Sequence, residues 1–252
     1  MTNKGGAKHL KTLPAPVDWP IHRKEVKWVV KPSAGPHPIR RCFPLLLIVR
    51  ELLGLAKNRS EAKTMISSGH VKVDGKEKLK DDYPVGSMDV VEISAINKIF
   101  RVLPSNKGLV LHPIEKGEKD YKLCKIVGKK TVENGQVQLN LHDGKNVLLK
   151  IGDPRQPKED VYHIHDVLKM RIPENEILAH LKFEDGILGL VDRGKNMGIF
   201  VEVTKIVQRV WPSQPSLALT DGKGNQFETI VDYVFPIGKG EPWVTLPQDD
   251  SA

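Results

Sequence analysis

The segment from Gly189 to Asn196 is the closest approach in this chain to a nucleotide-binding motif. Its order, Gly-Leu-Val-Asp-Arg-Gly-Lys-Asn, departs at one position from the loop with which nucleotide hydrolases cradle phosphates. That loop needs Ser or Thr after its lysine to hold magnesium, and Asn196 stands there instead. The loop must also open a helix, whereas residues 198–203 alternate like a strand. We therefore expect no nucleotide to bind here.

Histidines and serines offer two further candidates for chemistry. His163 and His165 could present two imidazoles on one strand face, but a zinc site needs three or four ligands and no partner stands at finger or protease spacing. Ser67, Ser68 and Ser87 lie in predicted helix ends and turns, without the strand-to-helix elbow of a serine nucleophile. We predict exposed strand histidines, no metal site, no cofactor and no catalytic residue.

A short capped helix is predicted from residue 58 onward. Asn58 and, three residues later, Glu61 can form a capping box that satisfies the backbone donors of the first turn. Gly69 supplies the residue that ends a helix most easily. The apolar residues that recur at helical spacing are Ala62, Met65 and Ile66. The helix is therefore one-sided, with its charged residues along the edges of the apolar face.

A basic strand follows this helix and ends in a tight turn. Residues 70–73 alternate with period two, which buries two valines, and Asp74-Gly75 is a strong hairpin signal before a returning apolar stretch at 83–93. The exposed basic residues of the helix and strand are Arg59, Lys63, His70 and Lys72. One shared basic surface would suit a phosphate backbone. A plain capped helix beside a hairpin with solvated charges remains the alternative.

Positive charge is concentrated at the N-terminus. The chain has a formal net charge of +8 and a pI of about 9.3, and residues 1–41 hold nine Lys or Arg against Asp18 and Glu25. This segment is too poor in apolar residues to fold alone, so we expect it to become ordered on an anionic partner. It shows no amphipathic period for a membrane and no targeting signal, which favours structured RNA. The basic residues expected to bind RNA are Lys4, Lys8, Lys11, Arg23, Lys24, Lys27, Arg40 and Arg41.

The most apolar run lies at residues 44–55. It is too short for a bilayer and is interrupted by Arg50 and Glu51, so it predicts a buried helix in a soluble protein. Cys42 and Cys124 are the two cysteines, far apart and without a CxxC motif, and we interpret both as reduced core residues of a cytoplasmic protein. After residue 93 the chain changes to strands separated by glycine turns. Length and pattern together predict an α+β protein of several domains.

The whole chain resembles one family, the archaeal and eukaryotic-type small-subunit ribosomal proteins numbered four with the suffix "e". Each matching block is short, and their order over nearly the full length carries the resemblance. The first blocks are Lys8-His9-Leu10-Lys11, Pro32-Ser33-Ala34-Gly35-Pro36-His37, Val73-Asp74-Gly75-Lys76 and Tyr83-Pro84-Val85-Gly86. The later ones are Gln138-Leu139-Asn140-Leu141-His142-Asp143-Gly144, Phe235-Pro236-Ile237-Gly238-Lys239-Gly240 and Pro242-Trp243-Val244-Thr245-Leu246-Pro247.

The resemblance implies a domain order and a function. It implies a basic N-terminal extension at 1–41, a helix-hairpin RNA-binding domain at 42–94, a central β domain at 95–173, an SH3-like KOW barrel at 174–212 and C-terminal strands at 213–252 that pack on the preceding domains. The implied protein is a non-catalytic constituent of the 30S subunit that binds and stabilises folded small-subunit ribosomal RNA. Its expected partners are that RNA and neighbouring small-subunit proteins, with neither a membrane nor a second copy of the chain.

The resemblance also places the glycine-rich loop of the barrel at residues 193–198. It makes Gly194, Lys195 and Asn196 candidate RNA contacts, although the family pattern has a second glycine at the position of Arg193 and an arginine at that of Ile199. The basic C-terminal extension of eukaryotic relatives is missing after Asp249 to Ala252, so we expect an archaeal form. An RNA-modifying enzyme of the pseudouridine-synthase type, with this helix-hairpin unit appended, is the alternative function. A KOW-bearing transcription or translation factor is a weaker third.

Overall fold

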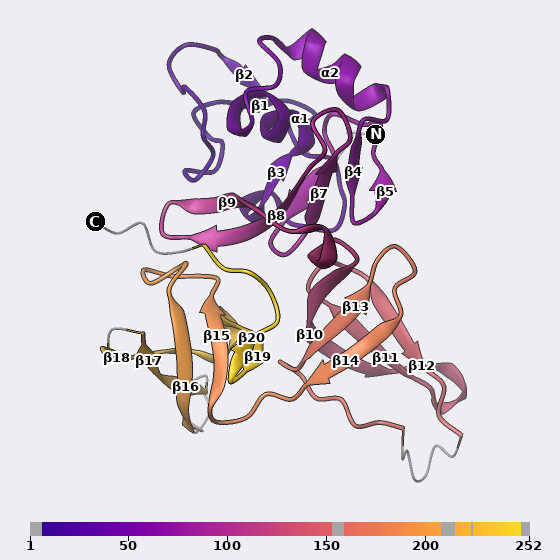
Figure 1. Ribbon diagram of the computed structural model, residues 1–252, viewed down its shortest axis with the longest axis vertical. Helices are drawn as coiled ribbons and strands as arrows, with labels where there is room; N and C mark the ends of the chain where they lie inside the picture. The colour runs from indigo at the N-terminus through magenta and orange to yellow at the C-terminus, as the bar shows by residue number, and fades with distance from the viewer. Residues whose placement is uncertain (1–6, 153–158, 208–214, 223, 248–252) are drawn as a thin grey trace, which may run out of the picture.

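The computed structural model describes residues 7–152, 159–207, 215–222 and 224–247. A unit containing both helices and strands lies at one end, and two β units lie side by side at the other (Figure 1). Two five-stranded sheets, one six-stranded sheet and two two-stranded pairs account for the described strands. No helix within the described ranges has the length and apolar character needed to cross a bilayer. The α+β, multidomain prediction is confirmed at this level.

The N-terminal segment folds onto the protein itself. Strands β1 (Leu10–Lys11) and β2 (Trp28–Val29) pair antiparallel, and a short 3-10 helix, η1 (Ile39–Arg41), follows. Trp19 is buried, and its indole Nε1 donates a hydrogen bond of 2.9 Å to the carbonyl oxygen of Cys42. The prediction that this segment needs an anionic partner to become ordered is wrong for residues 7–41, because the rest of the chain supplies the apolar surface that the segment lacks.

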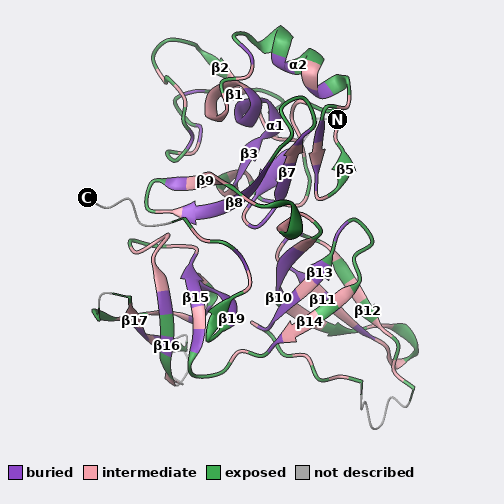
Figure 2. Ribbon diagram, viewed as in Figure 1, coloured by how far each residue is buried: buried purple, intermediate pink, exposed green. Residues whose placement is uncertain are grey.

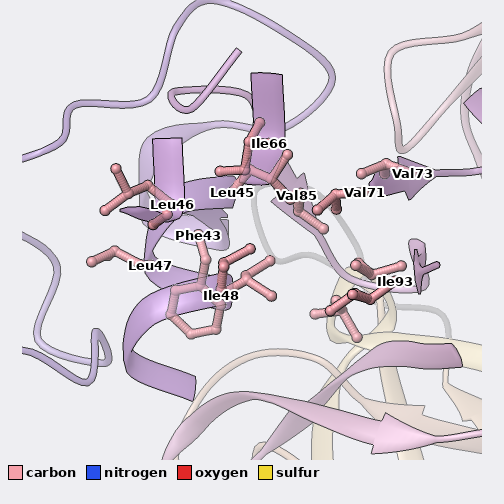
Figure 3. Close-up of a cluster of buried hydrophobic side chains, with 14 of the residues drawn as sticks. Phe43, Leu45, Leu46, Leu47, Ile48, Ile66, Val71, Val73, Val85 and Ile93 are labelled. Carbon is pink, nitrogen blue, oxygen red and sulfur yellow. The ribbon is translucent and has the colours of Figure 1, made fainter. Parts of the chain in front are cut away.

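The helical unit is built around the apolar run at 44–55. Its burial is confirmed, since the residues from Leu45 to Val49 have no exposed surface. The prediction of a single helix needs correction. The α-helix α1 spans only Leu45–Leu47, and the chain continues directly as a π-helix, η2 (Ile48–Leu52). A run that is apolar on every side gives no helical period from which to read its form. Figure 3 shows Leu45, Ile48, Ile66 and Val71 contributing to the core of this unit.

One five-stranded sheet supports the helices. Its order is β5-β4-β7-β8-β9, and a separate pair joins β3 (Cys42–Pro44) to β6 (Pro84–Gly86). The strands of the sheet are β4 (Val71–Val73), β5 (Lys76–Glu77), β7 (Val90–Ile93), β8 (Lys98–Ser105) and β9 (Gly108–Pro113). Because β7 and β8 form a hairpin, this sheet runs across residue 95, where the family resemblance implies a domain boundary.

The central sheet has the order β12-β11-β10-β13-β14. Its strands are β10 (Tyr121–Thr131), β11 (Val137–Leu141), β12 (Asn146–Leu149), β13 (Val167–Arg171) and β14 (Ile177–Leu181). Short 3-10 helices, η3 (Lys116–Glu118) and η4 (Glu133–Gly135), flank β10. β14, which lies in the range predicted for the barrel, pairs with β13 of this sheet.

The C-terminal sheet has the order β18-β17-β16-β15-β19-β20. Its strands are β15 (Ile187–Val191), β16 (Phe200–Val207), β17 (Ser216–Asp221), β18 (Gln226–Ile230), β19 (Val234–Lys239) and β20 (Glu241–Pro242), with a 3-10 helix, η5 (Val231–Tyr233), before β19. The strands after residue 213 thus share one sheet with β15 and β16. In Figure 2 buried residues concentrate on inner strands such as β7, β8 and β10, whereas α2 and β5 are largely exposed.

Candidate nucleic-acid interface

Helix α2 (Arg59–Ser67) begins at the cap that the sequence predicts. The Asn58 side chain accepts a hydrogen bond from the backbone N–H of Glu61 at 2.9 Å, and the Glu61 carboxylate accepts one from the N–H of Lys57 at 2.8 Å. Ala62 and Ile66 are fully buried, which fixes the inner face. Arg59 and Lys63 are exposed one turn apart, as predicted, and Arg59 contacts Asp81 at 3.5 Å.

The basic residues continue beyond the far end of α2. Gly69 ends the helix with a positive φ of 78°, His70 is exposed, and Lys72 lies half-buried on β4, 4.0 Å from Glu77. Asp74 and Gly75 both have positive φ, so the predicted tight turn closes the β4–β5 hairpin. The four basic residues thus lie on α2, just after its C-terminal end and on β4, and α2 alone is about 14 Å long at 1.5 Å per residue.

The N-terminal segment adds an aromatic group to this basic surface. Trp28 is 52% exposed, and two ammonium groups lie over its ring, Lys11 Nζ at 5.9 Å and Lys27 Nζ at 5.4 Å from the ring centroid. The His9 ring lies 5.7 Å away. Lys8 and Arg59 line one groove with Trp28, so the fold brings the N-terminal segment and α2 together. Sequence reasoning did not connect Trp28 with α2, because their proximity depends on tertiary packing.

Other predicted residues of this segment are placed differently. Lys24 is exposed, whereas Arg23 is half-buried and its guanidinium donates to backbone carbonyl oxygens, including those of Thr12 at 2.9 Å and Ala15 at 3.0 Å. Arg23 therefore holds the loop of residues 12–16 in shape and has few donors left for a ligand. Lys4 lies outside the described residues.

Arg40 and Arg41 lie at a second location, a cavity of about 410 Å³ where the three large sheets meet. Arg41 approaches Asp192 at 3.9 Å. Burial raises the pKa of Asp192 to about 6 and lowers that of Lys125 to about 8. The Lys125 ammonium donates to the Val234 carbonyl at 2.7 Å, which joins β10 to the C-terminal sheet. These charges serve the packing of the sheets against one another.

The glycine-rich loop borders the same cavity. Gly194 has a φ of 86° and lies against the Tyr233 ring, Lys195 is exposed, and Asn196 is half-buried. The loop joins β15 to its antiparallel partner β16, so the prediction that a strand and not a helix follows it is confirmed. No helix N-terminus is present to face a phosphate at this loop.

A buried charge network was missed by sequence reasoning. The Lys122 ammonium, 1% exposed, contacts Asp74 at 2.9 Å and Asp143 at 3.1 Å, and it also pairs with Asp89. His37 Nε2 lies 3.0 Å from the Asp89 carboxylate. These ion pairs hold the pKa values of Asp89 and Asp143 well below their ordinary range. The sequence did contain one indication of this network, because Lys122 stands in a strand, β10, whose neighbouring residues are apolar on both faces.

Cys124, His142 and Asp143 come close enough to suggest a metal site. Their ligand atoms already have protein partners, however. His142 Nδ1 accepts from the backbone N–H of Lys125 at 3.2 Å, and its Nε2 lies 3.3 Å from the Ser87 carbonyl. The Cys124 thiol donates to Asp143 at 3.8 Å, and burial raises its pKa. The group is explained as part of the buried network.

Cys42 and Cys124 are both free and buried, as predicted, and burial raises the pKa of Cys42 to about 12. The histidine prediction needs correction. His163 and His165 lie in the turn before β13 and not on a strand, since Asp166 accepts from the backbone N–H of His163 at 2.8 Å and stabilises that turn. His163 is exposed, and His165 is half-buried with a positive φ of 78°.

Comparisons with known proteins bear on this arrangement. Three family models match successive parts of the chain: the RS4NT (NUC023) domain over residues 4–40, the S4 domain over 48–91 and Ribosomal family S4e over 96–177. The small ribosomal subunit protein eS4 of Staphylothermus marinus is 49% identical over 98% of this chain and 99% of its own. The protein of the same name from Aeropyrum pernix is 47% identical, with 98% of each chain covered.

A solved structure is also similar. The crystal structure of the 30S ribosomal protein S4e from Thermoplasma acidophilum aligns with a TM-score of 0.66 at 28% identity. The alignment covers 79% of this chain and 96% of that one. The similarity therefore extends from sequence to fold over most of the molecule.

Proposed function

Since this chain belongs to the ribosomal family S4e, we propose that it is a non-catalytic, structural constituent of the small ribosomal subunit in the cytoplasm, where it binds and stabilises folded small-subunit rRNA. Its relatives are named as ribosomal subunit proteins and not as enzymes. Neighbouring small-subunit proteins are its further partners, and it acts as a single copy.

The observation that carries this proposal is the exposed basic edge of α2. Arg59 and Lys63 stand on one side of a helix whose opposite side is locked into the core by Ala62 and Ile66. The helix and β4 lie within the range matched by the S4 domain model. Cations on a rigid element contribute to RNA binding through release of counterions from the phosphates. Lys8, Lys11, Lys24 and Lys27 extend the same charge onto the N-terminal segment.

The finer organisation is part of the proposal. We take the divisions at residues 41 and 94 as functional domain boundaries, because the three family models cover 4–40, 48–91 and 96–177. The expected division at residue 173 is part of the proposal without this support, since the third model extends past it. The β15–β16 hairpin with its glycine-rich loop is assigned to an SH3-like KOW barrel. Lys195, exposed at the tip of this loop, is its best side-chain donor to RNA.

Charge reversal on α2 tests the function. The double variant Arg59→Glu/Lys63→Glu should bind small-subunit rRNA at least about tenfold more weakly, and the slope of log affinity against log salt should fall by roughly two. Both side chains are exposed, so the thermal melting temperature should stay close to that of the parent. Lys182→Glu/Lys205→Glu makes the same change in net charge at exposed positions of the other units and is the matched control.

The binding should be measured by filter retention across a salt series. A variant that melts normally and retains the affinity and salt slope of the parent would remove α2 from the RNA interface. An equal loss in both double variants would mean that only net charge matters.

A further inference from the structure

A groove of about 580 Å³ separates the β1–β2 pair from α2 and η2. In Figure 1 these elements lie together at the helical end of the molecule. The groove is lined by Lys8, His9, Trp28 and Lys31 from the N-terminal segment, and by Arg50 and Arg59 from the helical unit. Its volume falls within the range of small-ligand pockets, about 300–1,000 Å³. The groove can therefore take a single unit of a larger ligand.

Trp28 gives the groove an aromatic wall. Among the Trp and Phe residues of the described ranges, only Trp28 is exposed. Contact with water is unfavourable for such a large apolar ring. The Lys11 and Lys27 ammonium groups lie 5.9 Å and 5.4 Å from the ring centroid and keep its surroundings positive. An exposed indole among cations is the arrangement on which proteins stack unpaired nucleic-acid bases.

Charge on the opposite wall complements a phosphate. The Arg59 side chain is 65% exposed at the start of α2, and its ion pair with Asp81 at 3.5 Å leaves guanidinium donors free to reach a second acceptor. Lys31 donates to the carbonyl oxygen of Ala7, which fixes one end of the groove. Asp81 and Asp82 also line it, and Arg50 is paired with Glu51 at 2.6 Å, so the four cations of the lining face three carboxylates. Lys11 and Lys27 beside Trp28 add to the remaining positive charge, which favours an anionic ligand.

We propose that this groove holds one unpaired nucleotide of ribosomal RNA, with its base stacked on the Trp28 indole and its phosphates against Lys8 and Arg59. The inference rests on the proposed function and names one contact within it. A base inside a duplex is covered on both faces and cannot stack on a side chain, so the nucleotide belongs to a loop, bulge or single-stranded junction. An acidic protein segment would use the charges but would gain less from the indole face.

Two substitutions at Trp28 test the stacking. Trp28→Leu should weaken binding of the full-length chain to small-subunit rRNA by about 5- to 150-fold, since stacking contributes about 1–3 kcal/mol per base. Trp28→Phe keeps a ring and should restore most of the affinity. Neither change removes a cation, so the salt slope should stay at its parental value. Leu13→Ala, at a 74% exposed apolar residue of the same segment outside the groove, is the matched control.

Ultraviolet cross-linking supplies a second readout. Irradiation of the complex should attach a nucleotide to the peptide that contains Trp28, and mass spectrometry should locate it there. If the parent binds rRNA but Trp28→Leu binds equally well and no nucleotide is attached at Trp28, the groove proposal fails while the proposed function stands. If the parent does not bind rRNA, both fail.

Assembly onto isolated small subunits separates RNA from protein as the occupant. Trp28→Leu should lose affinity for the naked RNA and for the subunit in the same proportion. A variant that binds naked RNA normally but is poorly retained on the subunit would place a protein partner in the groove and overturn the proposal. Thermal melting of each variant should match the parent, because Trp28 is half-exposed at the edge of a two-residue strand.

Discussion

Lys122 is a buried residue on which two units of the molecule depend. Its ammonium on β10 is surrounded by the carboxylates of Asp74 and Asp89, which flank strands of the first sheet, and of Asp143 from the β11–β12 turn. Removing a charge from water is unfavourable by several kcal/mol unless partners replace the hydration. The network therefore joins the helical unit to the central sheet, and removing one partner would leave the others buried without a counter-charge.

Replacing Lys122 with an uncharged residue should strongly destabilise the protein. Lys122→Met should lower the free energy of unfolding by about 3–5 kcal/mol, since three carboxylates would lose their buried partner. Lys145→Met is the matched control, because Lys145 contacts Asp74 and Asp143 at 3.4 Å each but its side chain is 33% exposed. This variant should lower the free energy of unfolding by no more than about 1 kcal/mol. Urea unfolding measures both. Equal losses would show that burial of the ammonium is unimportant.

His142 should make stability depend on pH. Burial and the nearby Lys122 charge lower its pKa to about 3, against about 6.5 in an unfolded chain. Between these values the unfolded state binds the additional proton, so the free energy of unfolding decreases as pH falls from 6.5 toward 3. Asp192, with its pKa raised to about 6, acts in the opposite direction below pH 6, which makes a variant comparison necessary.

The comparison uses His142→Gln, whose free energy of unfolding should decline less steeply than that of the parent between pH 7 and pH 5. Asp192 is present in both proteins, so its contribution cancels in the difference. Parallel pH profiles for the parent and His142→Gln would contradict the assignment of a buried neutral imidazole.

At the scale of elements, the start of α2 is set by its cap. Asn58→Ala removes the acceptor for the Glu61 N–H and should lower the free energy of unfolding by about 1 kcal/mol. Ser60→Ala, at an exposed position of the first turn, should change it by less than half of that. Urea unfolding of the three proteins would decide, and a cap variant as stable as Ser60→Ala would count against the capping box.

Elements with local causes could be predicted from the sequence. The Asn58 cap, the Gly69 end and the Asp74-Gly75 turn each depend on residues a few positions apart, and all three were found. The division of residues 44–55 into α1 and η2 was not, because a run buried on all sides shows no period. Pairings such as β15 with β19 were also beyond reach, since more than forty residues separate the two strands.

At the scale of the whole molecule, Gly198 marks the contact between the C-terminal sheet and the β8–β9 turn. Its φ is 87°, and a Cβ would lie 2.5 Å from the Ser105 Cα, which is too close for any side chain. Gly198→Ala should therefore be destabilising through both backbone strain and the clash. Gly186 has a similar φ of 80° with open space around it, so Gly186→Ala isolates the strain, about 1–2 kcal/mol.

The difference between these two glycine variants measures the packing between sheets. In urea unfolding, Gly198→Ala should lower the free energy of unfolding by at least about 1 kcal/mol more than Gly186→Ala does. If both variants lose the same free energy, the C-terminal sheet does not pack on the β8–β9 turn as described.

The basic residues of the candidate interface could be predicted from the sequence, but the groove that they line could not. Counting basic residues identified the N-terminal segment, and helical periodicity placed Arg59 and Lys63 on an edge of α2. The groove could not be foreseen, because Trp28 and Arg59 are thirty-one positions apart and meet only through tertiary packing. The role of Arg23 was also not foreseen, because its donation to backbone carbonyls depends on how the loop of residues 12–16 folds back within the same segment.

Lysine acetylation footprinting compares the modification rate of each lysine in the free chain and in its complex with small-subunit rRNA. If the N-terminal segment and α2 form the RNA interface, binding should protect Lys8, Lys11, Lys24, Lys27, Lys63 and Lys72, while Lys182 and Lys205 are modified as fast as in the free chain. Protection confined to the central and C-terminal sheets, with the N-terminal segment and α2 unprotected, would contradict this interface.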